Sequence, residues 1–200
     1  MNTRSAIFMT FSSLLLTSIG MSQSTKPVNY LNVSGPIVFN SSSYDFAWSS
    51  HPSPTYYKHE YLKKGETVQK FNTMVMVELL TGTTTPKDLV ANKVAELKTM
   101  QSTNPYVQFE TFFNKDSNEY ILDFLVTANT ADNKEITIAE RNVYRYKVYS
   151  ENGKKGVLLF AVSTRSYGDN VTKFLQSLKG SRMDLVNKVK SFTVPAIVIK

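Results

Sequence analysis

Residues 136–165 read ITIAERNVYRYKVYSENGKKGVLLFAVSTR, two long apolar and aromatic runs separated by a polar stretch, ENGKK, at residues 151–155. Runs of this composition favour strands, and Asn, Gly and Lys clusters between them favour a turn. The stretch therefore predicts a β-hairpin with strands over residues 136–149 and 157–165. Large apolar side chains occupy both faces of these strands, so we expect the sheet to be covered at least partly on each side.

The register of this hairpin determines which charged side chains share a face. With Ser150 placed opposite Gly156, one face becomes basic. Its members are Arg141, Arg145, Lys147 and Arg165. Because guanidinium groups suit carboxylates and phosphates, we predict a partner-binding or anion-binding site there. The alternative is that Asp123 or Glu140 neutralises the arginines within the sheet, or that they simply stay solvated.

An earlier hairpin is expected over residues 56–62 and 68–80, with its turn at residues 63–66. Alternation in the first strand places tyrosines and a histidine on one face and charged residues on the other. A tight turn would set Glu60 across from Lys70, as a modest cross-strand ion pair.

A third hairpin is expected over residues 106–113 and 119–128. The favoured register sets Glu110 across from Leu122, so that Glu110 and Asp123 project from opposite faces. This argues against a shared acid and base site, although a slip of one residue would reverse the conclusion.

Two segments have helical periodicity. The first begins after Thr85, which can cap the helix, continues with a proline and an early aspartate, and ends near residues 104–105. The second covers residues 171–189 with a break at Gly180, and a last strand is expected over residues 193–199.

These elements predict an α+β fold, with an antiparallel β-sheet meander covered by helices as in an α/β sandwich. A length of 200 residues suits a single domain. Residues 23–43 are rich in Ser, Asn and Pro and are expected to form an extended N-terminal lead-in. The domain is then expected over residues 44–200.

Residues 1–22 are expected to be a signal peptide. Arg4 supplies a positive charge, and the apolar stretch over residues 6–16 is too short to span a bilayer. Cleavage after Gly20 or Ser22 would satisfy the preference for small residues. The chain has no cysteine, which excludes a lipoprotein anchor on cysteine and a disulfide framework. We therefore expect a bacterial periplasmic or secreted protein without a transmembrane segment after cleavage.

Few residues could carry catalysis. The sequence has no cysteine nucleophile and no Gly-x-Ser-x-Gly elbow, and its only histidines are His51 and His59. We interpret both histidines as surface residues, since their spacing with Glu60 matches no metal motif. The GKKG stretch at residues 153–156 is too short to cradle a phosphate. We therefore expect no catalytic residue, no metal and no cofactor, and we favour a protein that is not an enzyme.

The formal net charge is +7 and is unevenly distributed. Residues 111–140 contain two Lys against six acidic residues, whereas residues 141–200 contain twelve Lys and Arg against three acidic residues. Such asymmetry suits an anionic partner. Nucleic acid is not expected, because no recognised motif accompanies the charge and the chain is expected to be exported.

Four stretches carry a family resemblance. They are YDFAW at residues 44–48, NTMVMV at 72–77, TPKDLV at 85–90 and SRMDLVNKVKSFTV at 181–194. In order and content they resemble the PsbP-like and DcrB-like α/β sandwich family, which also includes the Ran-binding Mog protein. SSHP at residues 49–52 stands where that family usually has Gly-Trp. The resemblance implies an extrinsic subunit or partner-binding module, and it transfers no catalytic residue.

We therefore expect an exported, monomeric, non-enzymatic binding or accessory domain that recognises a protein partner or an anionic surface. One alternative is a small secreted hydrolase with an acid pair drawn from Glu110, Asp123 and Glu140. The other is an apolar-ligand carrier, which would need a cavity of roughly several hundred Å³ between sheet and helices.

Overall fold

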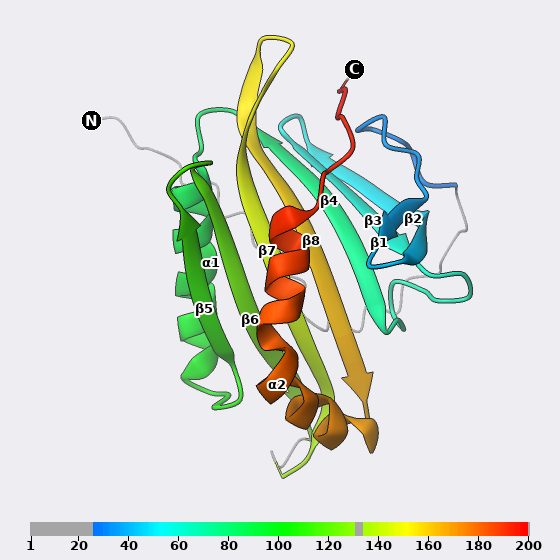
Figure 1. Cartoon of the computed structure of the whole chain (residues 1–200), viewed down its shortest axis with the longest axis vertical. Coiled ribbons are helices and arrows are strands. Elements are labelled where there is room, and N and C mark those ends of the chain that lie inside the picture. Colours follow the sequence, from blue (N-terminus) through cyan, green and yellow to red (C-terminus); the bar gives the residue numbers. More distant parts are fainter. Residues whose placement is uncertain (1–25, 131–133, 200) are drawn as a thin grey trace.

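The computed structural model describes residues 26–130 and 134–199. They form a single domain with one eight-stranded antiparallel sheet and two helices (Figure 1). The strands are β1 (Ile37–Phe39), β2 (Ser42–Ser53), β3 (Tyr56–Leu62), β4 (Thr73–Thr81), β5 (Gln108–Asn114), β6 (Glu119–Asn129), β7 (Ile136–Glu151) and β8 (Lys154–Tyr167). The helices are α1 (Pro86–Gln101) and α2 (Asn170–Ser191). The expected signal peptide lies outside the described residues.

The sheet is built from two meanders. Its strand order is β1-β2-β3-β4-β8-β7-β6-β5. After β4 the chain crosses through α1 to the far edge, and β5 to β8 then return until β8 pairs with β4. The expected α+β fold with an antiparallel sheet is confirmed, and the helical crossover through α1 divides that sheet into two four-stranded units.

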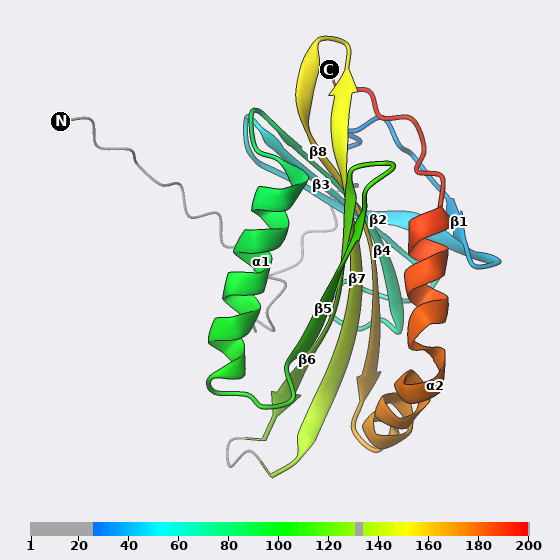
Figure 2. The ribbon, with the colours of Figure 1, turned by 60° about the vertical axis from the view of Figure 1, so that its left-hand side comes forward.

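The helices cover opposite faces of the sheet (Figure 2). We call these the α1 face, where α1 packs on β5, β6 and β7, and the α2 face, where α2 packs on β6, β7 and β8. Val90 and Leu97 of α1 join a buried cluster on the first face. Val186 and Val189 of α2 join a second cluster on the other. This confirms the prediction that both faces are covered.

Helix α1 begins as predicted, with a capping box. The Thr85 hydroxyl accepts a hydrogen bond from the Asp88 backbone N–H at 3.2 Å, and the Asp88 carboxylate accepts one from the Thr85 N–H at 3.1 Å. Pro86 occupies the first turn. Local residues thus satisfy the free N–H groups at the helix start.

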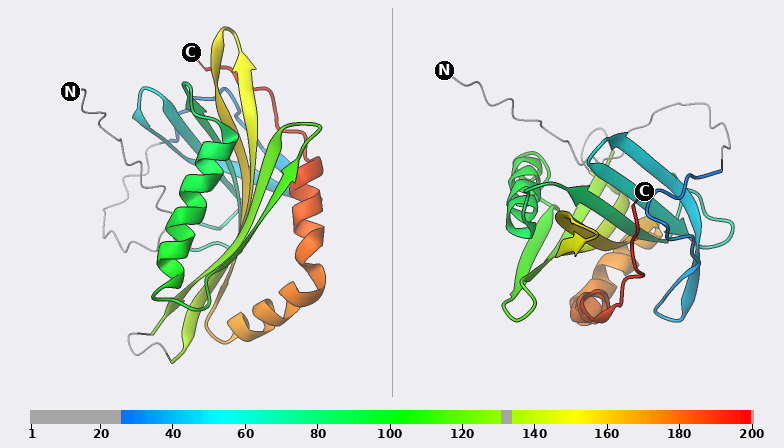
Figure 3. Two further views of the ribbon diagram at one scale, coloured as in Figure 1. Left: turned by 90° about the vertical axis from the view of Figure 1, so that its left-hand side faces the viewer. Right: turned by 90° about the horizontal axis from the view of Figure 1, so that it is seen from above.

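Helix α2 differs from the prediction. It continues through Gly180 without a break, although Figure 3 shows its axis bending along its length. Its N-cap residue Asp169 makes no side-chain capping bond. Residues 192–199 follow without forming the expected strand, yet Ile197 is buried and the Val198 N–H donates to the Leu31 carbonyl at 3.1 Å.

The N-terminal segment is part of the core rather than a separate lead-in. Leu31, Val33, Ile37 and Phe39 are all buried in the α2-face cluster. Because these apolar side chains need a covering layer, the packed domain begins well before residue 44.

The connection between β3 and β4 is longer than predicted. Strand β4 begins at Thr73, and Glu60 lies opposite Met76, so the expected pairing of Glu60 with Lys70 is wrong. Residues 63–72 form local turns instead, in which the Glu66 carboxylate accepts a hydrogen bond from the Asn72 N–H at 2.8 Å.

Candidate functional site

The β7–β8 hairpin closes through a two-residue loop. Asn152 and Gly153 have φ angles of 52° and 74°, the positive values that a type I′ turn requires. This loop sets Tyr149, and not Ser150, opposite Gly156. The expected register is therefore wrong by one residue, and such a slip moves side chains to the other face of the sheet. The Asn-Gly pair was the sequence signal for the shorter loop.

Arg141 lies buried on the α2 face and is neutralised there. Its Nε atom is 2.9 Å from Oδ1 of Asp123, which is also buried. The Oδ2 atom of Asp123 accepts from Nε of Arg182 at 2.6 Å, so one carboxylate holds two guanidinium groups. Arg141 also donates to the Arg182 carbonyl. These contacts tie α2 to β6 and β7.

Arg145 donates hydrogen bonds to the free carbonyl groups at the C-terminal end of α2. Its Nη1 atom lies 2.9 Å from the carbonyl oxygen of Val189, 2.8 Å from that of Lys190 and 2.8 Å from that of Phe192. Its Nε is 3.4 Å from the Glu119 carboxylate. A cation suits this place, because the last carbonyls of a helix lack intrahelical donors and carry partial negative charge.

Arg165 lies on the α1 face, away from the other two arginines. It faces Glu140, and its Nε donates to Oε2 of Glu140 at 2.6 Å. The guanidinium also stacks 4.1 Å from the Phe71 ring centroid. Asn142 and Ser163 continue this polar network at the sheet centre. The structure therefore does not bring the predicted arginines together on one exposed face.

Two of the candidate acids, Glu110 and Asp123, lie close together, but an arginine side chain pairs with both. Glu110 lies opposite Asp123 rather than Leu122, so both project from the α2 face. Arg182 bridges them, with Nη1 2.8 Å from Oε2 of Glu110. Glu140 is on the other face. Arg182 was missed at the sequence level, since its partners depend on how α2 docks.

Lys147 is the one predicted site residue that is exposed. It stands on the β7–β8 hairpin, whose tip also carries exposed Lys154 and Lys155. A surface hollow of about 430 Å³ lies beside that tip. It is lined by Pro54, Tyr57, Thr81, Gly82, Gly153, Lys154 and Lys155. We call Lys147, Lys154 and Lys155 the hairpin lysines.

Gly156 fixes the hairpin against β4. A Cβ atom at this position would lie 2.1 Å from the Leu80 carbonyl oxygen, closer than atoms can approach. The close contact between β8 and β4 therefore requires glycine here. It also places the hairpin tip beside the end of β4, where the hollow forms.

A second charged cluster was not predicted as a unit. On the α1 face, Lys58 Nζ lies 2.8 Å from Glu60 and 3.7 Å from Glu78, and the Tyr56 hydroxyl donates to Glu78 at 2.7 Å. Burial disfavours charged Lys58, but the carboxylates of Glu78 and Glu60 outweigh it and raise its pKa. Burial, followed by the Glu78 charge, raises the pKa of Tyr56. The spacing of Lys58 and Glu60, two residues apart on one strand, was the available signal.

The two histidines have different environments. His51 is exposed as expected, and its ring stacks on Tyr57 with centroids 4.1 Å apart. His59 is fully buried, which corrects the prediction of a surface residue. Its Nε2 accepts from the Tyr30 N–H at 3.1 Å, and burial lowers its pKa to about 4. Among residues 26–130 and 134–199, no group of three or more His, Asp or Glu side chains is placed to hold a metal ion.

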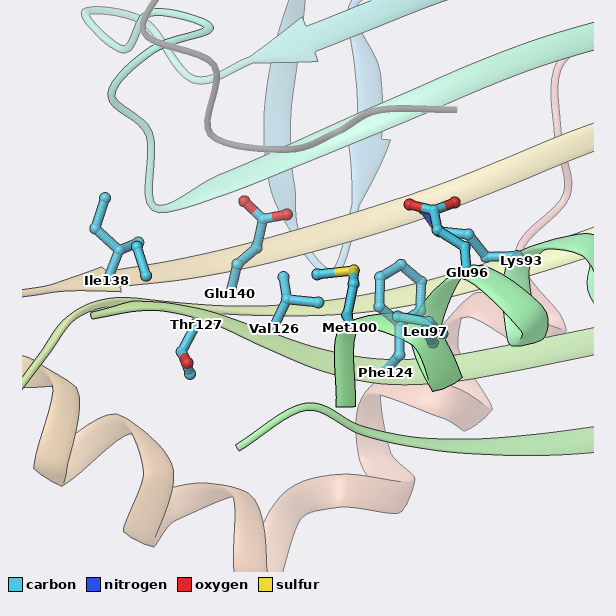
Figure 4. Close-up of a pocket in the computed structure, with 10 residues that line it drawn as sticks. Lys93, Glu96, Leu97, Met100, Phe124, Val126, Thr127, Ile138 and Glu140 are labelled. Atoms are coloured by element: carbon cyan, nitrogen blue, oxygen red, sulfur yellow. The ribbon is translucent and has the colours of Figure 1, made fainter. Parts of the chain in front are cut away.

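A small cavity lies between α1 and the sheet (Figure 4). Its volume is about 30 Å³, and apolar side chains such as Leu97, Met100 and Phe124 contribute to its lining. This is space for about one or two water molecules. Within the described part of the chain, neither helix is long and apolar enough to cross a membrane.

Comparison with known proteins gives a family and no closer relative. A family model matches residues 31–194, which include both helices and all eight strands of the described chain. No curated protein and no solved structure matches the chain.

Proposed function

We propose that this chain, which belongs to that family of unknown function, is an exported, non-enzymatic binding or accessory domain. Its partner is another protein or an anionic surface. The fold expected from the PsbP-like and DcrB-like resemblance, an α/β sandwich, is part of this proposal. Members of the PsbP-like and DcrB-like family serve as extrinsic subunits or partner-binding modules, and the proposal rests on that resemblance.

One observation supports this function best: every arginine in the described part of the chain pairs with a carboxylate of the same domain. Arg141, Arg145, Arg165 and Arg182 all pair with carboxylates of the same domain. The positive charge that remains for a partner is therefore carried by lysine. Of the hairpin lysines, Lys154 and Lys155 line the surface hollow, where they can meet carboxylate or phosphate groups.

The two alternatives receive less support. A hydrolase needs free carboxylates. Here Glu110 pairs with Arg182, and Asp123 pairs with both Arg182 and Arg141. A carrier of apolar ligands needs a cavity of roughly 300 Å³ or more. The enclosed space beneath α1 is about 30 Å³.

Charge reversal of two hairpin lysines, Lys154 and Lys155, tests the binding role. The variant Lys154→Glu/Lys155→Glu is compared with Lys98→Glu/Lys173→Glu, which changes the net charge equally at exposed positions of the two helices. The probes are vesicles of phosphatidylglycerol, with phosphatidylcholine as the neutral control, and a pull-down from periplasmic extract. We expect the hairpin variant to lose retention that the control variant keeps. Equal retention by the two variants, or no specific retention of the wild type by either probe, contradicts the proposal.

Export is tested separately by cell fractionation and N-terminal sequencing. We expect a periplasmic or secreted mature chain that begins at Met21 or Gln23. A cytoplasmic chain with its first residues intact would contradict this part of the proposal.

A further inference from the structure

The two outer edges of the sheet differ in protection. At one end of the strand order, β1 is only three residues long. Strand β2 beside it contains Pro52 and pairs with β3 through a register shift between Phe46 and Trp48, and the Val28 N–H donates to the Ser49 hydroxyl. Irregularities and proline are devices that discourage pairing with another chain. The edge formed by β1 and β2 is therefore protected against pairing with another chain.

Strand β5 forms the opposite edge and lacks these devices. Its sequence, QFETFFN, contains no proline or lysine, and all seven residues pair with β6 without a register shift. None of the described strands pairs with its outer side. Figure 3 shows β5 at the rim of the sheet. Every second N–H and C=O group of such an edge points outward and can accept another strand.

The residues of β5 also suit pairing with themselves. If two copies run antiparallel about a two-fold axis at Thr111, Phe109 lies opposite the partner's Phe113. Glu110 then lies opposite the partner's Phe112, so no two glutamates face each other. An axis at Glu110 would set two like charges together, which is unfavourable. The exposed side chain of Phe113 would be covered by the first of these arrangements.

We propose that β5 is a dimerisation edge, at which a second copy of this chain adds its own β5 antiparallel about Thr111. The sheet then continues from one protomer into the other. This replaces the monomer expected from the sequence, and it is independent of the binding role of the hairpin lysines.

Engineered cysteines test the register, because the natural chain has none. Residues opposite each other in antiparallel strands have Cα atoms about 4.5–5.5 Å apart, within reach of a disulfide. Under mild oxidation we expect Thr111→Cys to give a covalent dimer on a non-reducing gel. Ser150→Cys, at an exposed position on β7, should stay monomeric. Equal cross-linking of both variants, or none in Thr111→Cys, overturns the proposal.

Light scattering tests the dimer without a cross-link. Phe113 and Val148 are exposed to similar extents, 48% and 46%, but Val148 belongs to a central strand. We expect Phe113→Lys to halve the mass measured for the wild type, while Val148→Lys keeps it. Circular dichroism checks that both variants are folded. A wild type that stays monomeric at every concentration, or a dimer that survives Phe113→Lys, contradicts the proposal.

Discussion

The two helices lie on opposite faces of one sheet and are held by different interactions. Helix α1 carries its own start signal, the capping box of Thr85 and Asp88, and buries the apolar side chains of Val90 and Leu97. Its contacts with the sheet are therefore mostly apolar, and its start is set by neighbours in the sequence.

Helix α2 also buries valines, but remote charged groups fasten it. Asp123 of β6 receives Arg182 from the helix and Arg141 from β7. Arg145 binds the carbonyl groups at the helix end, whereas Asp169 gives no side-chain cap at the start.

This difference shows how a basic sheet face can arise without a ligand. Two of the arginines that were predicted to form a binding site, Arg141 and Arg145, supply the partners that α2 lacks locally. Buried charges of this kind are costly to separate, because each one left alone keeps its desolvation penalty. Their clustering is therefore better evidence for helix docking than for recognition.

Among the substitutions that test this comparison, Asp123→Asn should have the largest effect on the free energy of unfolding. It removes the charge that holds two arginines and should lower the free energy of unfolding by about 4 kcal/mol. Asp184→Asn, at an exposed acid of α2, should change it by less than about 0.5 kcal/mol. Urea denaturation measures both. Similar small losses in the two variants would show that α2 does not depend on the carboxylate.

Leu97→Ala should have the next largest effect, on the other helix. Leu97 is fully buried, and its truncation should cost about 3 kcal/mol by leaving a cavity. The partly exposed Leu89 is the control and should cost less. Hydrogen exchange should report the loss first in α1 amides. Faster exchange in α2 alone would contradict the division between the faces.

Acid should weaken the α2 face through His59. Its folded pKa of about 4 is below the ordinary value of 6.5, so the unfolded chain binds the proton first. Stability is therefore lost as pH falls from about 6.5 toward 4, on the order of 2 kcal/mol between about pH 7 and about pH 5. We measure the free energy of unfolding at several pH values. Its decrease with falling pH should be smaller in His59→Gln than in the wild type and unchanged in His51→Gln. Identical slopes in all three proteins would count against His59 as the sensor.

Thr85→Ala should have the smallest effect, about 1 kcal/mol, by removing the cap of α1. Asp169→Ala at the start of α2 should cost less, because its side chain makes no capping bond. Thermal unfolding compares the two. A larger loss in Asp169→Ala would reverse the contrast between locally and remotely held helices.

The elements with local signals were predictable. The start of α1 followed from Thr85 and Pro86, and the three hairpins followed from apolar runs around polar turns. The continuity of α2 through Gly180 and the pairing of β4 with β8 were not predictable, because both depend on contacts between segments distant in sequence.

The prediction of the candidate site was limited by errors of one residue in the expected strand registers. A difference of one residue moved Arg165 to the other face and brought Glu110 beside Asp123. For Arg141 and Arg165 the structure shows the alternative in which Asp123 and Glu140 neutralise them, whereas Arg145 pairs with Glu119. Only Lys147 of the predicted set stays exposed.

One crossed measurement tests the central claim that the arginines of the α2 face hold α2 and that the hairpin lysines face the partner. Arg145→Gln and Lys155→Gln each remove one positive charge. For each variant we measure the free energy of unfolding and the retention by phosphatidylglycerol vesicles or by a partner protein recovered in the pull-down. We predict that Arg145→Gln loses stability while the folded protein keeps its retention, and that Lys155→Gln loses retention while keeping its stability. The opposite assignment, with retention lost in Arg145→Gln and kept in Lys155→Gln, would contradict the account.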